Sequence, residues 1–122
     1  GQYNLLTAHN GAEGLEVVKQ YGDKIQLIVS DQKMPVMEGT EFLKKVRETN
    51  PQIVKILLTG HVGTDILVSA INDCDLFQYI LKPFEPEELK IAVESGITKA
   101  SMASNNKIYY KELRELFYKT IW

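Results

Sequence analysis

The sequence predicts an α/β fold in which a parallel, doubly wound β-sheet carries helices on both faces. Strand-like and helix-like segments alternate along the chain, and the connections between them are short. Two of the strand-like segments, residues 27–30 (LIVS) and 54–58 (VKILL), are dominated by apolar and β-branched residues. Such runs are typical of strands buried on both faces, as the strands of a parallel sheet are.

The first half of the chain contains two strand–helix units. Residues 3–8 (YNLLTA) predict a short strand, and residues 12–22 predict a helix that ends near a glycine. The strand at residues 27–30 is followed by a helix over residues 40–50 (TEFLKKVRETN). Pro51 disfavours continuation of that helix.

The second half repeats the pattern. Residues 54–60 predict a buried strand and residues 64–73 a helix, followed by a strand at residues 77–81 (FQYIL). Residues 85–100 predict the last helix of the series, with Pro86 in its first turn. The apolar residues expected to face inward from the helix at 64–73 are Ile66, Leu67, Ala70 and Ile71.

Composition restricts the class of protein. The 122 residues carry a net charge of -2, with 44% hydrophobic and 25% charged residues, which is typical of one globular domain. No basic surface for nucleic acid or membrane lipid is indicated. Cys74 is the only cysteine, so an internal disulfide and a cysteine-based zinc cluster are excluded. No apolar run approaches the length of about 20 residues that crosses a bilayer, and we expect a soluble, cytoplasmic protein.

Polar residues follow three of the predicted strands. Asp31, Thr59 and Lys82 come directly after LIVS, KILL and FQYIL. The carboxyl ends of parallel strands share one edge of the sheet, where ligands bind. A carboxylate there can attack a phosphoryl group, and an ammonium and a hydroxyl can meet the transferred charge. Each residue taken singly also fits a structural role: a strand stop, a turn residue before Gly60, and a solvated charge beside Pro83.

Three motifs carry a resemblance to a known family. The segments SDQKMPVMEG (residues 30–39), ILLTG (56–60) and QYILKPF (78–84) resemble the receiver domain of two-component response regulators. The match covers about residues 1–99, with the motifs in the family's order and spacing. The resemblance implies a flavodoxin-like fold and a signalling module of a phosphorelay, rather than an enzyme.

The resemblance also implies a role for each residue of the site. Asp31 matches the phosphoacceptor, Thr59 the switch hydroxyl and Tyr79 the switch aromatic residue. Lys82 matches the lysine that pairs with the phosphoryl group, and Lys33 the residue whose backbone carbonyl binds Mg²⁺. The implied partner is a sensor histidine kinase or a phosphotransfer protein.

Two further features follow from the resemblance. It implies a cis peptide bond between Lys82 and Pro83, which directs the lysine into the site. Among receivers, the motifs look most similar to those joined to cyclic-dinucleotide phosphodiesterase or cyclase output domains.

The chain also departs from the family. A receiver has five strands in the order 2-1-3-4-5, and its first strand ends in an acidic pair that holds Mg²⁺. The present sequence starts at the second strand, so strand 1, helix 1 and the acidic pair are missing. Glu13 and Glu16 are the nearest upstream carboxylates, but their helical pattern favours a solvated face. Asp31 with the Lys33 carbonyl is an incomplete site, and we expect weak or no Mg²⁺ binding in this chain.

Two functions therefore stay open. One is a phosphoacceptor receiver that switches an output, and the other is a pseudo-receiver that serves as a non-catalytic interaction or dimerisation module. The remaining candidates favour structural roles. His9 and His61 lack the spacing of a metal site, and Met34 and Met37 are expected to pack against the core.

Residues 100–122 extend past the receiver pattern. We predict a polar linker followed by an amphipathic helix, which either packs on the same domain or begins a connector to an output domain. The residues of its expected apolar stripe are Ile108, Leu113, Leu116, Phe117 and Ile121.

The missing strand has a structural consequence. Its loss would leave two open strand edges in the middle of the sheet, each with unpaired backbone donors and acceptors. The gap is expected to close by direct pairing, by a piece of the C-terminal tail, or by exchange with a second copy of the chain. Because strand exchange is a low-cost route to dimers, the sequence predicts a homo-oligomer.

Overall fold

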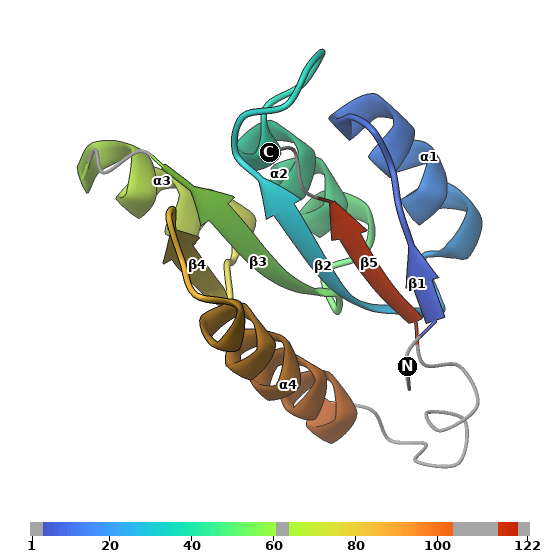
Figure 1. The fold of residues 1–122 in the computed structure, drawn as a ribbon. Helices are drawn as coiled ribbons and strands as arrows, with labels where there is room; N and C mark the ends of the chain where they lie inside the picture. The colour runs from blue at the N-terminus through green and yellow to red at the C-terminus, as the bar shows by residue number, and fades with distance from the viewer. Residues whose placement is uncertain (1–3, 61–63, 104–114, 120–122) are drawn as a thin grey trace.

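The computed structural model describes residues 4–60, 64–103 and 115–119, which form five strands and four helices (Figure 1). None of these helices combines the length and apolar character needed to cross a membrane. In chain order the elements are β1 (Asn4–Leu6), α1 (Gly11–Tyr21), β2 (Ile25–Asp31), α2 (Gly39–Thr49), β3 (Val54–Thr59), α3 (Thr64–Cys74), β4 (Gln78–Leu81), α4 (Pro86–Ala103) and β5 (Glu115–Lys119).

The predicted α/β fold is confirmed. All the strands are parallel and lie in the order β1-β5-β2-β3-β4. Helices α1, α2 and α3 lie on one face of the sheet and α4 on the other (Figure 1). The eight elements predicted up to residue 100 all occur, with ends that shift by a few residues.

Strand β2 is buried on both faces, as its apolar run predicted. Ile28 belongs to the core beneath α1 and α2, whereas Leu27 and Val29 belong to the core beneath α4. Gly96 allows α4 to approach closely, because a Cβ atom there would overlap the Leu27 side chain. The sheet thus separates two apolar layers and holds β2 rigidly between them.

Helix α3 differs from the prediction. Ile71 was expected to face inward, but 42% of its surface is exposed. The side chains of Ile66, Leu67 and Ala70 lie outside the described residues. At the end of the same helix, Cys74 is buried in the core beneath α2. Helical periodicity identifies an apolar stripe, but it does not show how much of that stripe a neighbouring element covers.

Residues 115–119 form a strand, where an amphipathic helix was predicted, and the other positions of the predicted stripe, Ile108, Leu113 and Ile121, lie outside the described residues. Residues 115–119 lie between β1 and β2, with Glu115 opposite Asn4 on one side and Lys119 opposite Ser30 on the other. The prediction failed because two unpaired parallel edges supply hydrogen-bond partners that an isolated helix cannot match. The first residues of the predicted linker, 100–103, continue α4.

Strand β5 lies between β1 and β2, where a gap in the sheet was expected from the sequence. It takes the position that strand 1 holds in the order 2-1-3-4-5, and it comes from the same chain. Of the three expected solutions, the structure thus has the C-terminal tail in the gap. The prediction of a homo-oligomer stays a prediction, since a single chain does not test it.

Candidate functional site

The three polar residues predicted at the strand ends meet at one edge of the sheet. Asp31 is the last residue of β2 and Thr59 the last residue of β3, and both are buried. Lys82 follows β4 and donates its backbone N–H to the Thr59 carbonyl over 2.9 Å. The register of the parallel strands, with Asp31 opposite Leu58, brings these ends together.

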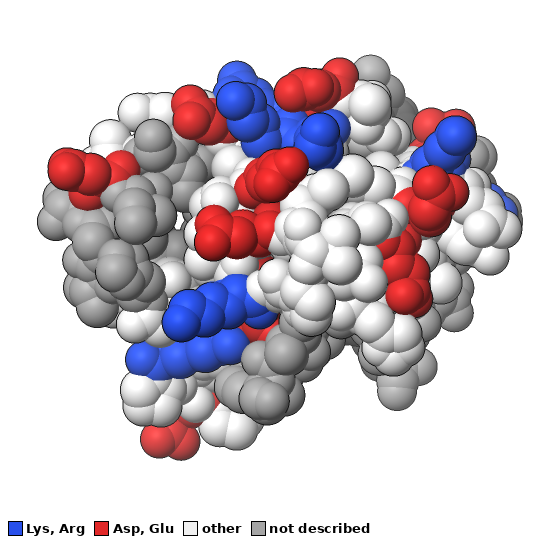
Figure 2. All heavy atoms as spheres, turned by 90° about the horizontal axis from the view of Figure 1, so that it is seen from above, with Lys and Arg blue, Asp and Glu red and all other residues white. Residues whose placement is uncertain are grey.

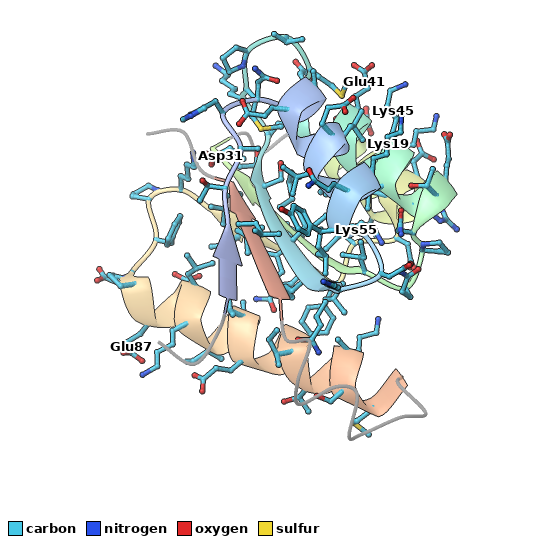
Figure 3. The ribbon with its side chains drawn as sticks, turned by 90° about the vertical axis from the view of Figure 1, so that its right-hand side faces the viewer. Lys19, Asp31, Glu41, Lys45, Lys55 and Glu87 are labelled. Carbon is cyan, nitrogen blue, oxygen red and sulfur yellow. The ribbon has the colours of Figure 1, made fainter. Side chains whose placement is uncertain are left out.

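An ion pair joins the two outer members of this set. The Lys82 Nζ atom lies 2.6 Å from Oδ1 of Asp31, which is fully buried, while the lysine side chain keeps 25% of its surface exposed. Asp31 lies at the carboxyl end of the sheet (Figure 3). The predicted cis peptide between Lys82 and Pro83 is present. The buried carboxylate thus has a cation that also contacts solvent.

The loop after Asp31 is fixed by backbone contacts. Gln32 donates its N–H to the Leu58 carbonyl over 2.8 Å and accepts the N–H of Gly39 over 2.9 Å. The Gln32 side-chain oxygen accepts the Thr40 N–H, also over 2.9 Å. A Cβ atom at Gly39 would overlap the Asp31 carbonyl oxygen, so only glycine lets α2 begin this close to the strand end.

A pocket of about 410 Å³ opens beside these residues. Two lysines and a buried hydroxyl line it, which suits a small anion, while Glu38 is the only carboxylate among the described residues of its lining. Figure 2 views the molecule from above and shows charges of both signs interspersed on this side. The lining residues are Gln32, Lys33, Glu38, Leu58, Thr59, Gly60 and Lys82.

The described residues do not fit a Mg²⁺ site. Mg²⁺ requires near-octahedral oxygen ligation, and no group of three or more His, Cys, Asp or Glu side chains in the described part of the chain could hold a metal. Glu13 and Glu16 lie exposed on α1. At the edge where the family carries its acidic pair, the register places Lys119 opposite Ser30. Weak Mg²⁺ binding therefore stays a prediction for this chain.

The other sequence candidates occupy ordinary positions. Met34 and Met37 are half-buried and pack against the core beneath α1 and α2, as predicted. His9 is exposed, and His61 lies outside the described residues. Tyr79 is 38% exposed on β4, next to the strand that carries Thr59.

The family is decided by comparison with known proteins. The model of the response regulator receiver domain matches residues 1–94. The chain belongs to this family. The match covers the whole candidate site, from β2 through the lysine after β4.

Receivers from several kinds of protein resemble this chain. The hydrogenase transcriptional regulatory protein HoxA of Cupriavidus necator is 32% identical over 79% of the chain, which spans only 20% of that relative. A crystal structure of a receiver domain protein from Clostridium thermocellum is 29% identical, with a TM-score of 0.74 and coverage of 81% of this chain and 78% of that one. The crystal structure of an adenylate cyclase from Rhodopirellula baltica is 30% identical, with a TM-score of 0.75 and coverage of 88% and 78%.

Sequence reasoning missed two contributors to this receiver site. One is Gln32, whose backbone and side chain anchor the start of α2. A glutamine after the aspartate gives no local signal of that role. The other is β5, which carries Lys119 to the edge of the sheet. The aromatic pair Phe117 and Tyr118 favours a strand and was the available signal.

Proposed function

We propose that this receiver accepts a phosphoryl group on Asp31 from a sensor histidine kinase or a phosphotransfer protein. The observation that carries the proposal is the 2.6 Å ion pair between Lys82 and Asp31, beside a pocket lined by lysines and Thr59. A fully buried carboxylate that is paired with a flexible ammonium at the end of a strand is arranged for reaction, because the ammonium can remain paired with the charge when it moves onto a phosphoryl group.

In the proposed reaction, a phosphoryl group moves from a histidine imidazole of the donor to the carboxylate of Asp31. A carboxylate oxygen of Asp31 attacks phosphorus, the phosphorus–nitrogen bond of a phosphohistidine breaks, and the imidazole leaves. The product is an acyl phosphate on Asp31. Lys82 pairs with a phosphoryl oxygen, and Lys33 lines the pocket as a second cation. Such catalysis consists mostly of positioning and electrostatics.

The response is proposed to be a shift between two conformations. A phosphoryl group on Asp31 presents oxygens that the Thr59 hydroxyl can bind, which draws the end of β3 toward the site. Tyr79 lies on the adjacent strand, is partly exposed, and is proposed to turn inward with it. A switch of this kind needs only a difference in hydrogen bonding between the two states.

The relatives suggest what accompanies this receiver domain in the whole protein. HoxA is a transcriptional regulatory protein and another relative is an adenylate cyclase, so we propose that an output domain follows this one. We also propose a cytoplasmic location, a homo-oligomer, and no nucleic-acid contact by this domain. The alternative, a pseudo-receiver that only mediates interaction, finds no support among these relatives.

Phosphoryl labelling tests the proposal. The chain is incubated with acetyl phosphate and Mg²⁺, and the modified residue is located by mass spectrometry after hydroxylamine treatment, which cleaves acyl phosphates. Label is expected on Asp31 and should be absent from Asp31→Asn, because an amide is a poor nucleophile. Asp23→Asn is the matched control, since Asp23 is exposed between α1 and β2. Label that persists in Asp31→Asn would overturn the assignment.

A further inference from the structure

Glu38 begins α2 without the contact that its position favours. The residue is the N-cap of α2 and has an extended backbone, but its side chain makes no capping hydrogen bond. N-cap side chains usually accept a backbone N–H of the first helical turn. The Gln32 side chain does so instead, because its Oε1 atom accepts the Thr40 N–H over 2.9 Å. The Glu38 carboxylate is therefore not needed to start the helix.

Gln32 also holds the Glu38 carboxylate beside the pocket. The Gln32 Nε2 atom donates to Oε2 of Glu38 over 3.3 Å and to the Thr40 hydroxyl over 3.2 Å. Glu38 is exposed and yet lines the pocket of about 410 Å³. In the part of the chain that the structure describes, no lysine or arginine forms an ion pair with Glu38. Its negative charge thus acts on whatever enters the pocket.

The charge matters because phosphoryl donors are anions. Lys33 and Lys82 line the same pocket and attract them, whereas Glu38 repels them. The interaction energy scales with the charge of the donor, so a doubly charged donor is repelled about twice as strongly as a singly charged one. A charge at the rim of a binding site changes mainly the rate of association and its dependence on salt.

We propose that Glu38 is a charge filter, which slows phosphoryl transfer from small, doubly charged donors more than from singly charged ones. The inference rests on the proposed phosphorylation of Asp31 and concerns the class of donor. Acetyl phosphate is doubly charged at neutral pH, and phosphoramidate is singly charged. With either donor the Asp31 carboxylate attacks phosphorus, and the bond from phosphorus to the leaving acetate or ammonia breaks.

Labelling rates with the two donors test the filter. They are measured at low ionic strength and constant Mg²⁺ in the unaltered chain and in Glu38→Gln, whose amide oxygen can still accept from Gln32. The variant should label Asp31 about two- to fivefold faster from acetyl phosphate, with a smaller gain from phosphoramidate. The gain should largely disappear at an ionic strength of about 0.5 M, because salt screens the rim charge. A merely structural role would not produce this dependence on donor charge and salt.

Glu41→Gln is the matched control for this experiment. Glu41 is an exposed carboxylate in the first turn of the same helix, and it does not line the pocket (Figure 3). Its substitution should leave the ratio of the two rates unchanged. An unchanged ratio in Glu38→Gln, or an equal change in Glu41→Gln, would overturn the charge filter and leave Asp31 as the acceptor. Absence of label from both donors would instead overturn the phosphoacceptor role itself.

Anion binding tests the filter without phosphoryl transfer. Sulfate and perchlorate are tetrahedral oxyanions with two charges and one charge, and each is titrated into Asp31→Asn while the amide shifts of Thr59 and Lys82 are followed by NMR. Adding Glu38→Gln should tighten sulfate binding about two- to fivefold at low ionic strength and perchlorate binding less. Equal sulfate affinities with and without Glu38→Gln, or no sulfate binding in either variant, would overturn the proposal.

Discussion

The Lys82 ammonium and the Asp31 carboxylate, 2.6 Å apart, join the ends of two strands that are not neighbours in the sheet. Asp31 ends β2 and Lys82 follows β4, with β3 between them. The contact depends on the register of all three strands and on the length of the lysine side chain. Because the carboxylate is fully buried, its charge is compensated within the protein rather than by bulk water.

Removal of the cation should destabilise the fold. Lys82→Met leaves a buried carboxylate without its partner, and the free energy of unfolding at neutral pH should fall by on the order of 1–3 kcal/mol. Lys33→Met is the matched control, since Lys33 lines the same pocket but is exposed, and its effect should stay within about 0.5 kcal/mol. Urea titrations measure both variants. Equal losses would contradict a specific role for the ion pair.

Thr59→Ala should separate phosphoryl transfer from the response to it. Phosphoryl labelling of Asp31 should continue, because the hydroxyl is not the nucleophile, whereas chemical-shift changes on β3 and β4 should shrink on phosphorylation. NMR spectra with and without acetyl phosphate provide the comparison. An undiminished set of shifts in the variant would remove Thr59 from the switch.

The buried Lys55 should limit stability at neutral pH. Burial lowers the pKa of Lys55 below its ordinary 10.5, and its Nζ donates to the Ile53 carbonyl over 2.8 Å. The folded state therefore binds fewer protons than the unfolded state between the two pKa values. The free-energy cost of burying the charged Lys55 ammonium is complete below its folded-state pKa and disappears as the pH rises toward 10.5. The free energy of unfolding should therefore increase with pH in that window.

Lys55→Met should test this cost. The variant should raise the free energy of unfolding at neutral pH by on the order of 1–2 kcal/mol and flatten its dependence on alkaline pH. Lys45 is exposed on α2, and Lys45→Met should change neither quantity appreciably (Figure 3). If Lys55→Met is destabilised and its free energy of unfolding still increases with pH in the alkaline range, the Lys55 amine does not cause that pH dependence.

Val36 should be a site of backbone strain. It has a φ of 72°, a left-handed conformation that β-branched residues rarely adopt, and 80% of its surface is exposed. Val36→Asn should raise the free energy of unfolding by about 1 kcal/mol, because asparagine tolerates this conformation and little packing is lost. Val68→Asn, at an exposed position within α3, should give no such gain in thermal unfolding. The strain is refuted if both variants behave alike.

The convergence of Asp31, Thr59 and Lys82 could be predicted from the sequence, because all three lie at the ends of strands. Asp31 and Thr59 end apolar runs, and the convergence of parallel strands at one edge follows from topology alone. The same reasoning does not predict the exposure of Tyr79 or the role of Gln32, because each depends on a neighbour that local sequence does not identify. Such contacts are properties of register and packing.

The C-terminal strand shows the limit of periodicity. Leu116, Phe117 and Ile121 fit a helical stripe approximately, and the run of aliphatic and aromatic residues at 116–118 fits a strand equally well. What decides between them is the open edge between β1 and β2, which is distant in sequence. The need for a segment to close that edge was predictable, but the choice among the three ways of closing it required the structure.

Gly39 should control the position of Asp31. A Cβ atom there would overlap the Asp31 carbonyl oxygen, which is backbone and has little room to move. Gly39→Ala should therefore lower the free energy of unfolding by about 1–3 kcal/mol and slow phosphoryl labelling of Asp31, because the strand end must shift away from Lys82.

Gly60→Ala supplies the matched control for that variant. Gly60 lines the same pocket, but a Cβ atom there would meet nothing within 4 Å, and its φ is not positive. Its substitution should leave stability within about 0.5 kcal/mol and labelling unchanged. Urea unfolding and the rate of acetyl phosphate labelling are measured on both variants. If Gly39→Ala labels Asp31 as fast as Gly60→Ala does, the close approach of α2 to the strand end does not position the carboxylate.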